Sequence, residues 1–311
     1  MTEIFDVSVA GAAATELDSG AFTAIDEGVL HILRIKCVGQ GTGLGLIYVN
    51  EDQTDNNYRR DFWQSDTTHG SFLRTNDPAF TYATDRTYAE FYVLKVNDVV
   101  FFFGQGGRLT TNRAWFVGGW NNVETTLSRI ELVSVTASQL GVGTRMQLIR
   151  VDDADAEGTY EVSGAAATDL SSGALTGYGT GGDMFLVAAG VRHTAGATNT
   201  KLYLAGNTTD ANYNSGSNNS DGGGEGAFPL NMVSDANEES AAVGLVQVLP
   251  NSGGIAATFM AMRKRASASN FRAFALGTRI TDTDLDEIEL NCDTASGLDV
   301  GSFLKFWKIN N

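Results

Sequence analysis

Two turns rich in acidic and amide residues are the stretches of this chain whose residue types suit a metal ion. They span residues 50–57 and 207–221, and Asp55 of the first recurs as Asp210 of the second. Carboxylate and amide oxygens are the ligands that calcium prefers. Asp and Asn also close turns by accepting hydrogen bonds from their own backbone, which is the commoner reason for them. We therefore expect turn capping first and calcium binding second.

The residues that catalysis needs are sparse. The three histidines, His31, His69 and His193, are not spaced as zinc ligands, and the chain has no nucleophile elbow or Walker loop. The glycine-rich run at residues 104–107 resembles a phosphate loop, but no helix is predicted after it to supply an anion-binding terminus. We expect a hairpin turn there, and we predict no enzymatic activity, no cofactor and no metal centre.

Aromatic side chains offer another kind of binding site. Trp63, Trp115 and Trp120, with Tyr58 and Phe62, are candidates for a face that stacks on sugar rings. The alternative interpretation places Trp115 and Trp120 in the core or in a subunit interface. The first interpretation predicts a glycan affinity that falls on Trp63→Ala or Trp120→Ala.

These candidates must be positioned by a fold that the sequence contains twice. The stretch at residues 54–58 returns 155 positions later at 209–213, and residues 11–21 match 164–174 at a constant offset of 153. Near the end of each copy, residues 130–132 match 288–290 at an offset of 158. Drifting offsets place small insertions in the loops. The turn residues that the repeat makes equivalent are Asp55, Asn57 and Tyr58 in the first copy, and Asp210, Asn212 and Tyr213 in the second.

The chain of 311 residues therefore reads as two domains, residues 1–152 and 158–311, joined by a short acidic stretch. The periodicity is that of strands: Leu33, Ile35 and Cys37 alternate with Arg34 and Lys36. No long amphipathic helix is visible, and at most one helical turn is expected at residues 12–17. We predict an all-β protein, two tandem jelly-roll-like β-sandwich domains related by internal duplication. Residues 207–226, rich in Gly, Asn and Ser, are expected to form a long loop, either free or ordered by a neighbouring subunit.

Charge and composition bear on the partners. A net charge of −16 argues against a protein that neutralises phosphates, because its one basic cluster, residues 263–265, is short. No secretory signal is visible at the N-terminus, and the longest apolar runs, such as residues 99–103, are far shorter than a membrane helix. The two cysteines, Cys37 and Cys292, occupy non-equivalent places, so a disulfide framework is not expected. We expect a soluble protein made in the cytoplasm, with no nucleic-acid or membrane partner.

The motifs of both copies resemble a known family. Each has an apolar strand, a polar turn and an Asn-Tyr pair, then Arg-Ala-aromatic (residues 113–115 and 272–274), then Ile-x-Leu, a Gly-bearing turn and a last strand. This is similar to a jelly-roll-like module of tailed-bacteriophage virion proteins, whose units read roughly L-x-L-x-F-N-x-D-x-x-x-N-Y. Both copies depart from that pattern at its Phe-Asn, with Val49-Asn50-Glu51-Asp52 in one and Ala205-Gly206-Asn207 in the other.

The resemblance implies a structural component of a phage particle. The expected role is a capsid decoration, cement or minor capsid protein that stabilises the shell through subunit contacts with the major capsid protein, as a homo-oligomer such as a trimer. The expected location is therefore the virion. The alternative is a tail or fibre protein that contacts a tail protein and binds host-surface glycans.

Overall fold

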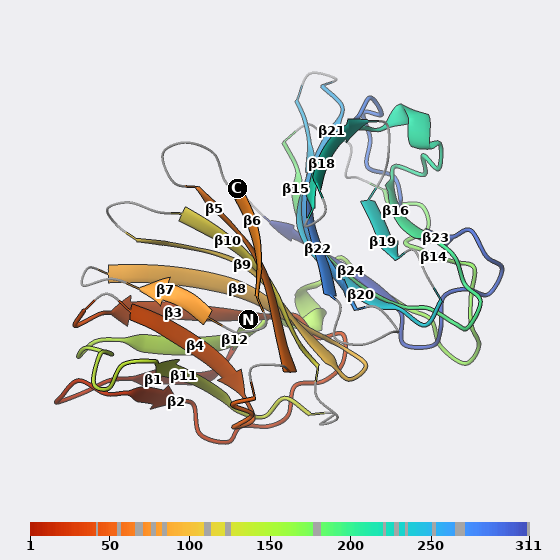
Figure 1. Ribbon diagram of the computed structural model, residues 1–311. Helices are drawn as coiled ribbons and strands as arrows, with labels where there is room; N and C mark the ends of the chain where they lie inside the picture. Colours follow the sequence, from red (N-terminus) through yellow and green to blue (C-terminus); the bar gives the residue numbers. More distant parts are fainter. Residues whose placement is uncertain are drawn as a thin grey trace. The chain divides into compact units, whose positions relative to one another are not determined.

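The computed structural model describes most of the chain. The described residues are 1–41, 43–54, 57–65, 71–75, 79–82, 86–108, 113–121, 126–176, 182–219, 222–226, 230–233, 236–250, 253–264 and 271–309. They divide into two compact units, Met1–Asp152 and Asp153–Asn311 (Figure 1). Apart from two short 3-10 turns, Asp153–Asp155 and Asp210–Asn212, the regular elements of these residues are strands. The protein is all-β.

The described residues of the first unit form twelve strands. They are β1 (Thr2–Ser8), β2 (Glu16–Asp18), β3 (His31–Val38), β4 (Gly43–Val49), β5 (Tyr58–Ser65), β6 (Ser71–Thr75), β7 (Ala79–Tyr82), β8 (Arg86–Val96), β9 (Val99–Arg108), β10 (Arg113–Asn121), β11 (Ile130–Ser134) and β12 (Arg145–Arg150).

The strand order of the first unit is that of a jelly roll with an extended sheet. The larger sheet runs β1-β12-β3-β8-β9-β10-β5-β6 and the smaller sheet runs β2-β11-β4-β7. If β5, β6, β9 and β10 are set aside, the remaining eight strands in chain order give sheets 1-8-3-6 and 2-7-4-5. That arrangement is the jelly-roll pattern of two interleaved Greek keys. The four additional strands, from two insertions, extend the larger sheet beyond β8.

The second unit repeats this order strand for strand. Its strands are β13 (Gly158–Glu161), β14 (Asp169–Ser171), β15 (Met184–Arg192), β16 (Thr200–Leu204), β17 (Asn214–Asn219), β18 (Gly222–Gly226), β19 (Leu230–Val233), β20 (Glu239–Val248), β21 (Ile255–Lys264), β22 (Phe271–Ile280), β23 (Ile288–Cys292) and β24 (Phe303–Ile309). The sheets run β13-β24-β15-β20-β21-β22-β17-β18 and β14-β23-β16-β19. The predicted tandem duplication of a jelly-roll sandwich is confirmed.

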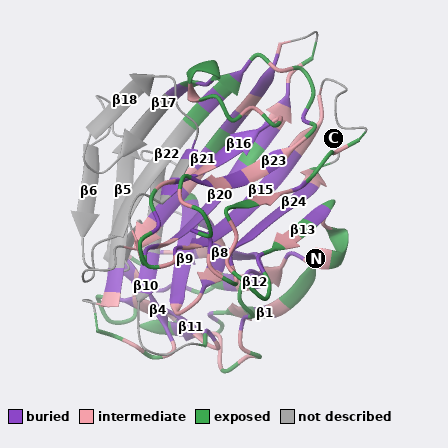
Figure 2. Ribbon diagram, turned by 90° about the vertical axis from the view of Figure 1, so that its right-hand side faces the viewer, coloured by how far each residue is buried: buried purple, intermediate pink, exposed green. Residues whose placement is uncertain are grey.

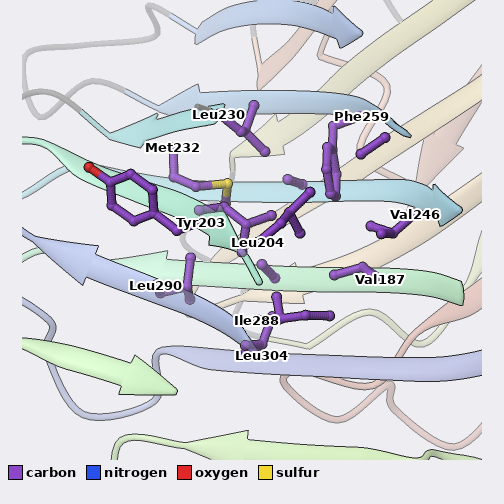
Figure 3. Close-up of a cluster of buried hydrophobic side chains, with 14 of the residues drawn as sticks. Val187, Tyr203, Leu204, Leu230, Met232, Val246, Phe259, Ile288, Leu290 and Leu304 are labelled. Carbon is purple, nitrogen blue, oxygen red and sulfur yellow. The ribbon is translucent and has the colours of Figure 1, made fainter. Parts of the chain in front are cut away.

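Alternating side chains place one core between the two sheets of each unit. In β3, Leu33, Ile35 and Cys37 are buried, whereas Arg34 is exposed. The second unit encloses an equivalent cluster, in which Leu204 and Ile288 of the smaller sheet meet Val187, Val246 and Phe259 of the larger one (Figure 3). The buried residues of the described chain lie mainly on the strands, where they are drawn in purple (Figure 2).

Two local predictions were wrong. Residues 104–107 lie inside β9 and not in a hairpin turn. The stretch expected to be a loop at 207–226 contains the antiparallel pair β17–β18. Its Asn, Ser and Gly residues have low strand propensity, but the ladder to β22 supplies main-chain hydrogen-bond partners that override this preference.

In each unit a glycine on one strand faces an aromatic ring on the neighbouring strand. The strand that carries the glycine in one unit carries the ring in the other. In the first unit Gly104 of β9 pairs with Phe91 of β8, whereas in the second Phe259 of β21 pairs with Gly244 of β20. A Cβ at Gly104 would overlap the Phe91 ring, and a Cβ at Gly244 would overlap the Phe259 ring. Both rings are 3% exposed and belong to the cores. Glycine is needed at both places because a Cβ would overlap the ring and also a backbone carbonyl oxygen of the neighbouring strand, which is Glu90 O for Gly104 and Thr258 O for Gly244.

Candidate functional site

The repeated Asn-Tyr motif builds a corner between β4 and β5. The Tyr58 hydroxyl accepts a hydrogen bond from Val49 N at 2.8 Å and donates one to Asp52 O at 2.7 Å. Between these partners the chain turns through Asn50 and Glu51, which have φ of 52° and 61°. Left-handed backbone is costly for residues other than glycine. The tyrosine therefore fastens a strained turn to the end of β4.

The carboxylate of Asp52 completes this corner. It accepts hydrogen bonds from Trp120 Nε1 at 2.9 Å, Asn57 Nδ2 at 2.8 Å and Thr54 N at 3.1 Å. Burial acts to raise the pKa of Asp52, but these hydrogen bonds outweigh it and hold the pKa below 3.8. The oxygens that a calcium ion would need are thus engaged in capping.

The second unit builds the same corner without the carboxylate. The Tyr213 hydroxyl accepts from Leu204 N at 2.7 Å and donates to Asn207 O at 2.9 Å. Asn207 Oδ1 accepts from Asn212 Nδ2 at 2.9 Å and Thr209 N at 3.3 Å. The left-handed positions are Ala205 and Gly206, with φ of 57° and 59°.

Most of the repeat-equivalent turn residues have structural partners. Asn57, Tyr58, Asn212 and Tyr213 form the two corners described above. Asp210 accepts from Tyr203 and forms an ion pair with Lys201 Nζ at 2.7 Å. Asp55 lies outside the described residues. Asp52 and Asn207 therefore cap their turns through Thr54 N and Thr209 N, as expected, whereas Asp210 bonds side chains, and calcium binding at these turns stays a prediction.

Two of the five aromatic candidates are core residues. Trp120 is fully buried and Tyr58 is 4% exposed, both within the core of the first unit. The interpretation of these two as sugar-stacking residues is wrong, because a bound sugar could not reach them. Trp63 and Trp115 are paired directly across β5 and β10; their side chains, like that of Phe62, lie outside the described part.

Three carboxylates meet on the smaller sheet of the first unit. Glu16 and Asp18 come from β2 and Glu131 from β11, and one oxygen from each lies within 4.8 Å of the others. Glu131 is directly opposite Asp18 in the strand ladder and is only 3% exposed. The spacing of residues gives no signal for this group, because 113 positions separate Asp18 from Glu131. An acidic residue inside the apolar run of β11 is the one sequence feature that could have marked it.

Arg129 lies beside this acidic group. Its Nε donates to Asp18 Oδ1 at 2.9 Å, a second nitrogen contacts Asp18 Oδ2, and a third pairs with Glu51. These contacts lower the pKa of Asp18. Burial, followed by the charge of Glu16, raises the pKa of Glu131. The pKa values of Asp18 and Glu131, which lie on adjacent strands, are thus shifted in opposite directions.

The second unit contains a buried polar cluster of its own. His193 Nε2 lies 2.5 Å from Thr200 Oγ1 and 3.8 Å from Cys292 Sγ, and Sγ donates to Thr198 O at 3.1 Å. His193 is 5% exposed and Cys292 1%, so this pair is closed to a substrate. Burial raises the pKa of the other thiol, Cys37, to about 11, and both cysteines are free and buried. Neither has the environment of a reactive thiol.

Comparison with known proteins assigns no family to the chain. No family model and no curated protein matches it. Among solved structures, domains LG4-5 of the mouse laminin alpha1 chain align at 10% identity and a TM-score of 0.20, over 98% of this chain and 90% of that one. A double variant of OccD1 (OprD) aligns at 10% identity and a TM-score of 0.12, over 97% of this chain and 99% of that one. Both TM-scores are too low to bear on fold or function. Within the part of the chain that is described, no helix is long and apolar enough to cross a membrane.

Proposed function

We propose that this protein is a structural component of a phage particle, a capsid decoration, cement or minor capsid protein that binds the shell. One observation carries the proposal: the Asn-Tyr pair that the duplication repeats holds the backbone of an equivalent corner in each unit. Tyr58 and Tyr213 fasten equivalent corners, and Asn57 and Asn212 cap them. A doubled module whose repeated residues maintain shape suits a building block.

The charge of the chain supports an outer position. A net charge of −16 repels packaged nucleic acid and favours a face turned to solvent. Subunit contacts would then supply the stabilisation, through buried surface and strand pairing between copies and the major capsid protein, with copies forming a homo-oligomer such as a trimer. The mechanism requires no bond to be made or broken.

Location on the particle tests this proposal. Purified particles of the virus that encodes this chain should contain it by mass spectrometry, and gold-labelled antibody against it should decorate the heads. Absence from particles would overturn the proposal. Label restricted to tails would reject the head position and leave the tail alternative.

Function on the shell can be tested separately. Heads stripped of this protein should rebind the purified full-length chain saturably, and their thermal disruption should shift to higher temperature. Heads that neither rebind it nor gain stability would contradict the cement role, even if the chain is found in particles.

One observation favours a second candidate, a tail or fibre protein that binds host glycans. Trp63 and Trp115 are opposite one another on β5 and β10, in the inserted part of the larger sheet. Aromatic residues offer a large apolar surface with a polar edge, which suits contact with a sugar ring. On a glycan array, Trp63→Ala or Trp115→Ala should abolish binding, whereas Tyr88→Ala, at an aromatic residue of the same unit that is 49% exposed, should not. Wild-type protein that binds no glycan would remove this candidate.

A further inference from the structure

Glu131 is buried in a way that its protein partners do not explain. The side chain is 3% exposed, and Oε2 is buried without a hydrogen-bond partner. A carboxylate removed from water needs compensation at both oxygens. The unmatched oxygen therefore calls for a ligand that the chain itself does not provide.

The neighbours of Glu131 add negative charge where positive charge is needed. Glu16 and Asp18 bring their carboxylates to within 4.8 Å of it, from the edge strand of the smaller sheet. Glu16 is exposed and Asp18 is half-buried, so the group opens toward solvent on one side. Three converging carboxylates repel one another unless a cation lies among them.

Arg129 compensates only part of this charge. Its guanidinium group is shared between Asp18 and Glu51, and its Nε stays 3.6 Å from Oε1 of Glu131. Four carboxylates thus face one guanidinium group, and the buried Oε2 of Glu131 gains no hydrogen bond from it.

We propose that Glu16, Asp18 and Glu131 form a binding site for a hard divalent cation of the calcium and magnesium class. Carboxylate oxygens are the donors that these ions prefer over softer transition metals. Three protein ligands leave coordination positions for water, which the exposed side at Glu16 can supply. The cation would join β2 to β11, at the edge of the smaller sheet.

The second unit provides an internal comparison. The strand ladders place Asp169, Ser171 and Glu289 where the first unit has Glu16, Asp18 and Glu131. Ser171 removes one carboxylate and donates instead to Glu287. Glu289 Oε1 accepts from Asn291 Nδ2 at 2.7 Å, so its carboxylate has a protein partner. We therefore infer one cation site in the described part of the chain, in the first unit.

The site can be tested on the full-length protein with calcium and magnesium chloride as probes. After treatment with EDTA, calorimetric titration should show one equivalent of cation bound, and the unfolding midpoint should rise by a few degrees at several times Kd. Glu131→Gln, which keeps the shape of the side chain, should weaken binding roughly tenfold or more because it removes ligand charge. The matched control Glu289→Gln should leave the affinity unchanged.

Three results would overturn the proposal. The first is no binding by the EDTA-treated wild type to either ion. The second is that the Glu131→Gln variant and a second variant, Asp18→Asn, both bind the cation with the same affinity as the wild type. The third is a variant Glu131→Gln that is more stable than the wild type in EDTA while neither responds to calcium, since Glu131 would then be an uncompensated buried acid. None of these outcomes depends on a role in a phage particle.

Discussion

The two corners reach the same geometry with different side chains. In the first unit the Asp52 carboxylate accepts from the indole of Trp120. The strand registers place Ile280 at the position of Trp120, and Asn207 instead donates its amide to Asp282 at 2.6 Å. What the copies share is the tyrosine hydroxyl and the backbone groups that it joins. The fold therefore requires the hydroxyl, whereas the charge beside it can be exchanged.

The exchanged Phe and Gly residues show that the two cores, like the two corners, are built with different side chains at equivalent positions. Phe91 over Gly104 and Phe259 over Gly244 fill equivalent space from opposite strands. The duplication preserved the volume of the pair and not the position of the ring. Packing thus constrains the sum of the two residues more tightly than either residue.

The largest effect is expected from breaking one of these pairs. Gly104→Phe places two rings in the space of one, and we expect it to cost at least about 3 kcal/mol of unfolding free energy. Phe91→Gly should cost a similar amount by opening a cavity. The double variant, which reproduces the residue types of the second unit, should recover the part of the loss that comes from the two rings, whereas the contact of the new Cβ with Glu90 O remains. Urea unfolding followed by tryptophan fluorescence measures this.

The reciprocal exchange in the second unit is the control for this swap. Phe259→Gly combined with Gly244→Phe should likewise be more stable than the two single variants predict together. If either double variant merely adds the losses of its singles, then the two positions do not share one volume, contrary to our interpretation.

A smaller effect is expected at the corner tyrosines. Tyr58→Phe leaves Val49 N without its acceptor, and Tyr213→Phe does the same to Leu204 N. Each change should cost about 1–3 kcal/mol because a buried donor loses its partner. Unfolding free energies in urea, compared with the exposed substitution Tyr88→Phe, measure the loss. Equal values for Tyr58→Phe and Tyr88→Phe would show that the hydroxyl is dispensable.

The smallest effect concerns acid stability and separates the two corners. The folded pKa of Asp52 lies below 3.8, so its contribution is complete above that pH and is lost as the pH falls through the folded pKa. Asp52→Asn should cost about 1 kcal/mol at neutral pH, and this difference should shrink below about pH 4. Thermal unfolding midpoints between pH 2 and 7 would reveal it, as roughly those pH limits bracket the titration. A difference that stays constant over this range would contradict the charge-assisted hydrogen bonds.

The sequence was informative where its signals are local or repeated. Alternation in β3 predicted strands, and the repeated stretches, among them the match of Tyr58 to Tyr213, predicted the duplication. Glycine misled the prediction inside β9, because the need for Gly104 comes from a ring and a carbonyl oxygen on the neighbouring strand, those of Phe91 and Glu90. The match of Trp115 to Phe274 was also one position out, since the ladders place Ala275, opposite Met260, where Trp115 lies opposite Gln105.

The group of Glu16, Asp18 and Glu131 could not be predicted from local sequence patterns. Glu16 and Asp18 look like solvent-facing residues of a short strand, and Glu131 belongs to a strand more than a hundred residues away. Only the ladder of β2 with β11 brings them together. A site assembled by strand pairing leaves no spacing motif in the chain.

The order of strands also affects how the chain is made. β1 pairs with β12, and Thr2 is opposite Arg150, so the larger sheet of the first unit cannot be completed until Arg150 has been synthesised. Contacts between such distant residues make folding slow, because the entropy of closing the intervening chain is lost before the strand pairing can stabilise the fold. During synthesis the N-terminal strand therefore leaves the ribosome long before its partner, and its backbone needs protection from pairing with other nascent chains.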